Sequence, residues 1–129
     1  MNENAKAWVA ALRSGEFTQG RGSLKSPEGY CCLGVACELF RRAHPEEAGW
    51  VHYIRYDQFL LNESGNTHAL PLRVMHWLGL RDNYGVFQSD IGEPSLAAMN
   101  DTNHTFEEIA NMIEMKPDNL FVKEESNAS

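Results

Sequence analysis

The sequence lacks the short motifs that identify common phosphate-binding and nucleophilic enzymes. It contains no GxGxxG or P-loop pattern, and Gly20-Arg21-Gly22 is too short to form a phosphate loop. No serine lies in a nucleophile-elbow pattern. These absences favour a protein that is not an enzyme, and a small hydrolase or transferase is the alternative.

Metal ligands at a recognisable spacing are also lacking. The cysteines Cys31, Cys32 and Cys37 form no CxxC pair, and the five histidines form no i, i+4 pair. An odd number of cysteines is typical of a reducing compartment. We expect buried, inert thiols, no metal and no cofactor; a site formed by the cysteines with His44 is the less favoured alternative.

Excess positive charge and long apolar runs are missing as well. The 129 residues include 11 Lys and Arg against 18 Asp and Glu, a formal net charge of −7. A general nucleic-acid binder needs a basic stripe for phosphates. No apolar run approaches the roughly 20 residues that cross a bilayer, and residues 1–7 are too polar for a signal peptide. We expect a cytoplasmic protein that binds neither nucleic acid directly nor membranes.

The most apolar stretch predicts the element that organises the fold. From position 32 to position 42, apolar residues recur at helical spacing on nearly every side, which is typical of a surrounded helix. Gly34 costs this helix roughly 1 kcal/mol against alanine, and a second backbone crossing close by would explain it. The sequence Ser26-Pro27-Glu28-Gly29 favours a type I turn, and therefore a short hairpin over 22–31.

Helical patterns at 4–14, 70–80, 94–100 and from Thr105 to just before Pro117 predict four more helices. Residues 50–61 are ambiguous, and we interpret them as a short strand or an irregular segment. The expected fold class is α+β and mainly helical, with about five helices around a central buried helix (32–42) and a small hairpin (22–31). Residues 1–122 are expected to form one domain, and 123–129 a disordered tail.

Four polar residues have no obvious packing role in the pattern: Gln19, Asn100, Asp101 and His104. In one interpretation, Asn100 and Asp101 form a tight turn between helices, where Asn and Asp accept local backbone donors, and Gln19 satisfies loop backbone. In the other, these residues line a pocket for a polar small molecule. A catalytic version makes Asp101 or Glu108 the base and His104 its partner, although Glu108 is also expected in a capping box with Thr105. The turn is the favoured interpretation.

Four aromatic residues cluster in the least regular segments: Trp50, Tyr53, Tyr56 and Tyr84. They belong either to the core of the second half or to a surface that recognises a protein partner, because Tyr and Trp are enriched at such surfaces.

Several short stretches together resemble a known group of sequences. They are W-V-x-A-L-R-S-G from Trp8, Q-G-x-G-x-L from Gln19, Y-C-C-L-G-V from Tyr30, W-L-G-L from Trp77 and N-D-x(4)-F-E-E-I-A from Asn100. In this order they resemble a group of small uncharacterised proteins encoded by phages, prophages and bacteria. The resemblance implies a biological setting and no activity, so no catalytic or binding residue is carried over from it.

The combined hypothesis is a phage- or prophage-type binding or accessory protein in the cytoplasm, that of the host if a phage encodes it. A counter-defence factor that binds a host protein or a nucleotide-like small molecule fits this setting. The alternatives are a small hydrolase or transferase using Asp101 and His104, and a structural or assembly protein that forms a homo-oligomer.

Overall fold

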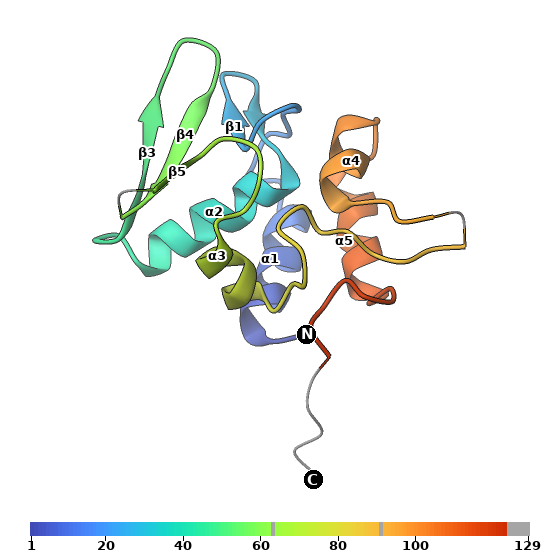
Figure 1. Ribbon diagram of the computed structural model, residues 1–129. Coiled ribbons are helices and arrows are strands. Elements are labelled where there is room, and N and C mark those ends of the chain that lie inside the picture. Colours follow the sequence, from blue (N-terminus) through green and yellow to red (C-terminus); the bar gives the residue numbers. More distant parts are fainter. Residues whose placement is uncertain (63, 91, 124–129) are drawn as a thin grey trace, which may run out of the picture.

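The computed structural model describes residues 1–62, 64–90 and 92–123 (Figure 1). Within these residues the chain forms five helices: α1 (Glu3–Arg13), α2 (Cys32–Ala43), α3 (Leu72–Leu78), α4 (Leu96–Asp101) and α5 (Phe106–Glu114). It also forms five strands: β1 (Lys25–Ser26), β2 (Gly29–Tyr30), β3 (Ala48–His52), β4 (Asp57–Leu61) and β5 (Ser64–Asn66). In Figure 1 the sheet and the α4–α5 pair lie on either side of α1 and α2.

The strands form one antiparallel sheet in the order β2-β1-β4-β3. Strand β4 pairs with β3 along its whole length, from Asp57 opposite His52 to Leu61 opposite Ala48. On its other side β4 pairs with β1 at Asp57 and with β5 from Phe59 to Leu61. Strand β4 therefore joins the small β1–β2 hairpin to the rest of the sheet.

The fold is α+β, but the predicted mainly helical arrangement around a central helix (32–42) is wrong. Helices account for 37% of the described residues, and strands together with isolated bridge residues for 20%. The predicted hairpin (22–31) is one part of a five-stranded sheet. The prediction failed at 50–61, which contains most of a β-hairpin and not one strand. Its turn, Tyr53 to Tyr56, is as aromatic and apolar as a strand, so the sequence does not mark the reversal.

Helix α2 lies against α1, α3, α4 and strands β2 and β3. A Cβ atom on Gly34 would overlap the carbonyl oxygen of Leu24, so the expected close backbone crossing is confirmed. The indole Nε1 of Trp8, on α1, donates to the carbonyl oxygen of Cys32 at 2.8 Å. The start of α2 is thus fixed from two directions, by the Leu24 backbone at Gly34 and by the Trp8 side chain at Cys32.

Helices α1 and α5, from opposite ends of the described chain, pack side by side. The guanidinium of Arg13 on α1 binds Glu107, Asn111 and Glu114 along α5. Helix α5 begins with the predicted capping box of Thr105 and Glu108, which is confirmed.

Glu38 is a buried carboxylate on α2 that accepts hydrogen bonds from three side chains. Arg41 and Arg42 donate at 2.8 to 2.9 Å, and the indole Nε1 of Trp50 donates at 3.0 Å. Burial alone would raise the pKa of Glu38, but these donors outweigh it and lower the pKa to about 2. The cluster holds β3 against α2 through Trp50.

No helix in the described part of the chain is long and apolar enough to cross a membrane. The tail predicted at 123–129 lies, apart from Lys123, outside the described residues.

We expect Gly34→Ala to lower the free energy of unfolding by about 3 kcal/mol, because the new methyl group would push α2 away from Leu24. Gly49→Ala is the matched control, since a Cβ there meets no atom within 4 Å. That change should be neutral or slightly stabilising. Urea denaturation of both variants provides the measurement, and equal stabilities would contradict the close crossing.

Glu38 should make stability fall in acid. Its folded pKa is lower than the unfolded value, so its contribution is present above pH about 4.5 and is lost as the pH falls toward 2. Between these limits the loss from this one group should be about 3 kcal/mol. The variant Glu38→Gln should be less stable at pH 7 and should show a shallower decline. In Glu114→Gln, which loses only an exposed ion pair with Arg13, the decline should stay close to that of the original chain.

Candidate functional site

Asn100 is completely buried, and its side-chain amide holds three segments together. Its Oδ1 accepts from Gln19 Nε2 at 2.9 Å and from the backbone N–H of Cys32 at 3.1 Å. Its Nδ2 donates to the carbonyl oxygen of Gly20 at 2.8 Å. An amide used in this way is a structural connector, and it presents no free group to a ligand.

Gln19 and His104 complete this connector. Gln19 Nε2 also donates to the carbonyl oxygen of His104 at 2.8 Å, which ties the loop before β1 to the turn between α4 and α5. The ring of His104 lies with Nδ1 at 3.2 Å from the carbonyl oxygen of Met99. Of the four predicted ligand-binding residues, Gln19, Asn100 and His104 are thus occupied by contacts within the chain.

Asp101 lies at the end of α4 and faces the surface. Its Oδ1 accepts from the backbone N–H of Gly22 at 2.9 Å. It lines a small cavity of about 100 Å³ together with Gly22, Ser23, Cys31, His68, Tyr84 and Ala97. Asp101 therefore fixes the loop before β1, and it also borders this cavity.

A larger groove of about 450 Å³ adjoins this cavity, because Gly22, Ser23 and His68 line both. The remaining lining residues come from the loop before β1, the β1–β2 turn, the tip of the β3–β4 hairpin and the segment after β5: Arg21, Ser26, Glu28, Arg55, Tyr56 and Thr67. Figure 1 shows the two hairpins side by side at this end of the sheet. We call this feature, with the small cavity, the hairpin groove.

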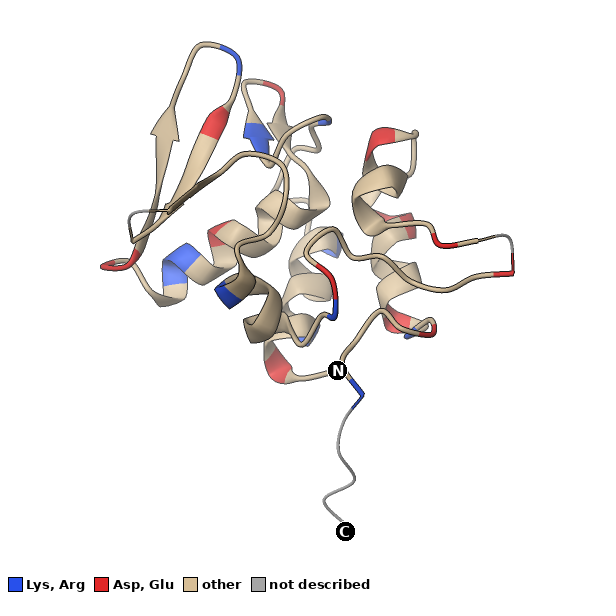
Figure 2. Cartoon of the chain, in the orientation of Figure 1, with Lys and Arg blue, Asp and Glu red and all other residues tan. Residues whose placement is uncertain are grey.

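The arginines of the hairpin groove differ from the others. Arg13, Arg41, Arg42 and Arg73 form ion pairs, and Arg81 donates to Asn119. Among the described residues, Arg21 and Arg55 have neither an ion pair nor a side-chain hydrogen bond. Both line the hairpin groove, and Figure 2 shows basic segments in the loop before β1 and at the β3–β4 tip on the same side of the molecule. The groove therefore brings together two guanidinium groups that are available for an anion.

The structure separates the predicted aromatic surface into different environments. Trp50 is partly buried on the face of the sheet toward α2, with its ring 4.9 Å from that of Phe59. Tyr53 and Tyr56 are exposed at the hairpin tip with ring centres 5.3 Å apart. Tyr56 lines the hairpin groove, and exposed Tyr84 lines its small cavity. Tyr56, Tyr84 and Asp101, predicted for two separate sites, thus border one feature.

The prediction of buried thiols is confirmed: Cys31, Cys32 and Cys37 are free and buried. Burial raises the pKa of Cys31 to about 11, and it raises the pKa values of the other two well above their usual range. These thiols therefore stay protonated and unreactive near neutral pH. In the described part of the chain, no three His, Cys, Asp or Glu residues are placed to hold a metal ion.

Four residues that line the hairpin groove were not predicted from the sequence as site residues: Arg21, Ser23, Arg55 and His68. A signal for Arg21 was present, because a residue between two glycines, Gly20 and Gly22, lies in a loop that can approach a ligand closely. For Arg55 no such signal exists, since its role depends on the turn that the sequence did not reveal.

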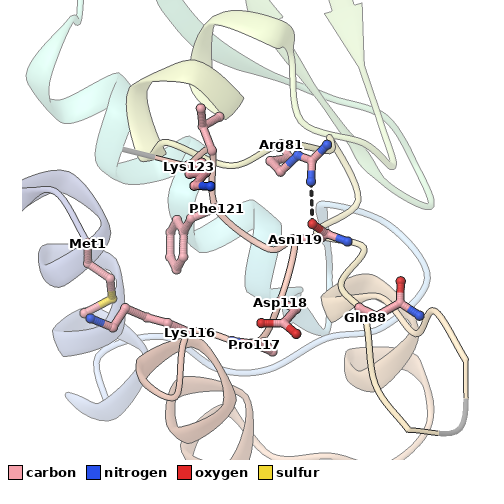
Figure 3. Close-up of a pocket in the computed structure, with 10 residues that line it drawn as sticks. Met1, Arg81, Gln88, Lys116, Pro117, Asp118, Asn119, Phe121 and Lys123 are labelled. Atoms are coloured by element: carbon pink, nitrogen blue, oxygen red, sulfur yellow. Dashed lines mark hydrogen bonds between the residues drawn. The ribbon is translucent and has the colours of Figure 1, made fainter. Parts of the chain in front are cut away.

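A larger cavity of about 930 Å³ lies where residues 116–123 pass the start of the chain (Figure 3). It is lined by Lys116, Lys123 and Asp118, and by Arg81, whose guanidinium donates to Asn119. Its lining contains no Tyr or Trp, and its arginine is already engaged. In contrast to the hairpin groove, this cavity therefore offers no arginine without a partner.

The model of one protein family, described as "Domain of unknown function (DUF8296)", matches residues 1–117. The chain belongs to this family. No curated protein and no solved structure matches the chain.

Replacing Asn100 distinguishes the structural role from a ligand-binding one. We expect Asn100→Ala to lower the free energy of unfolding by about 3 kcal/mol, because it leaves the Cys32 N–H and the Gly20 carbonyl buried without partners. Asp101→Ala loses one exposed hydrogen bond and should cost less than about 1 kcal/mol. Thermal or urea unfolding measures both, and a fully stable Asn100→Ala protein would contradict the role of Asn100 as connector.

Proposed function

We propose that this member of the DUF8296 family is a small binding protein that holds an anionic, nucleotide-like small molecule in the hairpin groove. The observation that carries the proposal is the placement of Arg21 and Arg55. They are the arginines without a partner in the described part of the chain, and both line one groove.

The groove combines the groups that such a ligand needs. A guanidinium donates two parallel hydrogen bonds to a phosphate or carboxylate, which fixes both position and orientation. Tyr56 and His68 supply flat faces for a planar ring. The hydroxyl groups of Ser23 and Thr67 already contact the Lys25 carbonyl and His68 Nδ1, and each keeps a lone pair that can accept a hydrogen bond from the ligand. A volume of about 450 Å³ is within the usual range for small-molecule sites.

The contacts of Asp101 and His104 favour binding over catalysis. Asp101 accepts from the Gly22 backbone N–H, while His104 lies against the Met99 carbonyl. No hydrogen bond joins the two side chains among the described residues, as a base and its partner would require. In our proposal Asp101 positions the loop that carries Arg21, and it does not act on the ligand chemically.

The resemblance to phage, prophage and bacterial sequences supports a setting for this activity. A protein that sequesters a nucleotide-like signal in the host cytoplasm would act as a counter-defence factor without any catalytic step. Binding of a host protein is the second candidate, favoured by Ile54, which is 90% exposed at the hairpin tip beside Tyr53.

Native mass spectrometry of the protein purified without dialysis, beside its denatured mass, is the first test. We expect additional mass that is lost on denaturation. Calorimetric titration with nucleoside mono- and diphosphates and cyclic dinucleotides should then give a dissociation constant, which Arg21→Ala and Arg55→Ala should each raise about tenfold or more.

The controls are Lys116→Ala and Lys123→Ala, which remove cations from the cavity of Figure 3. They should leave the dissociation constant unchanged. If they weaken binding and the arginine variants do not, the ligand occupies the other cavity and the proposal is wrong. Absence of binding to the whole panel, with no co-purified mass, would also reject it and direct attention to a host protein at Ile54.

A further inference from the structure

Strand β3 is the outer strand of the sheet, and its free edge runs along one side of the molecule (Figure 1). It pairs with β4 through five consecutive residue pairs, without a bulge. Its other edge pairs with no strand in the described part of the chain. A regular strand with one free edge is able to accept another strand.

The register shows which backbone groups point outward. At the two ends of the β3–β4 ladder, Tyr53 N donates to the Tyr56 carbonyl and Asn62 N donates to the Glu47 carbonyl. Hydrogen-bonded and non-bonded pairs alternate along an antiparallel ladder. Gly49 and Val51 are therefore the strand residues bonded to β4. The peptide groups of Ala48, Trp50 and His52 point to the free edge, where Ala48 N already donates to the His44 carbonyl.

The residues of this edge lack the types that protect many exposed strands in monomeric sheet proteins. Its sequence, Ala48-Gly49-Trp50-Val51-His52, contains no lysine, proline, Asp or Glu. In a chain with a net charge of −7, it is a stretch along which two copies can approach without facing carboxylates.

We propose that this edge binds the same edge of a second copy, with β3 antiparallel to the partner's β3 around a two-fold axis beside Trp50. In this register Trp50 pairs with Trp50 of the partner subunit, and Ala48 pairs with His52 of the partner subunit. Every outward donor and acceptor gains a partner except Ala48 N, which already donates to the His44 carbonyl, and the His52 carbonyl oxygen that faces it. The result is one continuous sheet across a symmetric dimer.

Charge at the two ends of β3 favours a second copy over an unrelated strand. Glu46 lies in the turn before β3, and Arg55 lies in the turn after it; Figure 2 shows an acidic turn and a basic tip at these ends. Antiparallel pairing brings each Glu46 toward the partner's Arg55. Neither residue has an ion pair within its own described chain. With five N–H donors, Arg55 can contact both this carboxylate and a ligand in the groove.

The backbone test compares His52→Pro with His52→Ala, using native mass spectrometry and light scattering across a range of concentrations. Both variants lose the imidazole contact with Asp57, but proline alone removes the outward N–H, and an edge position tolerates it. We expect a dimer for the original chain and for His52→Ala, and a folded monomer for His52→Pro. A monomeric original chain, or a dimer that survives His52→Pro, would overturn the proposal; loss of the dimer in both variants would assign it to the imidazole and also overturn it.

The charge test compares Glu46→Lys with Glu3→Lys, which changes the net charge equally at an exposed position of α1. Glu46→Lys places a cation near the partner's Arg55 and should raise the dimer dissociation constant about tenfold. Glu3→Lys should leave it unchanged or lower it slightly. Equal effects of the two variants would show that only net charge matters and would reject this register. Arg55 serves both proposals, so they are separated by residues that serve only one: Arg21→Ala should weaken ligand binding alone, and His52→Pro should remove the dimer alone.

Discussion

The buried amide of Asn100 is the interaction on which the rest of the structure depends. An amide in the interior must find partners for its polar atoms, and those of Asn100 come from Gln19, Gly20 and Cys32. These residues lie in the loop before β1 and at the start of α2. One side chain on α4 thereby sets the position of a loop and of a helix terminus, and the hairpin groove is built on that same loop.

The sequence predicted those features that are decided by nearest neighbours along the chain. The capping box at Thr105, the close approach at Gly34 and the buried cysteines follow from local spacing and residue type, and the structure contains them. Strand β5 was missed because its sequence, Ser64-Gly65-Asn66, has low strand propensity and is extended only because it pairs with β4. Tertiary pairing, unlike capping, leaves little trace in a single sequence.

The same distinction applies to the candidate site. Asn100 and Asp101 were expected in a tight turn between helices, with local backbone partners, but both lie at the end of α4 and their partners Gly20, Gly22 and Cys32 are far away in the sequence. The role is structural, as the favoured interpretation expected, yet it depends on long-range contacts and not on a local turn. The grouping of Tyr56, Tyr84 and Asp101 around one groove depends on three segments meeting in space, which no spacing in the chain predicts. Arg21 and Arg55 are candidates for ligand binding because the other arginines have partners within the chain. Those partners can be identified only from the folded structure.

The packing of α1 against α5 has a consequence for how the protein is made. The apolar face of α1 is synthesised well before its neighbour α5, which follows it after the five strands and three further helices of the described chain have been made. Until Glu107, Asn111 and Glu114 emerge, Arg13 has no partner from that helix and the face of α1 stays uncovered. The core of this domain therefore cannot be completed until α5 has been synthesised and has left the ribosome.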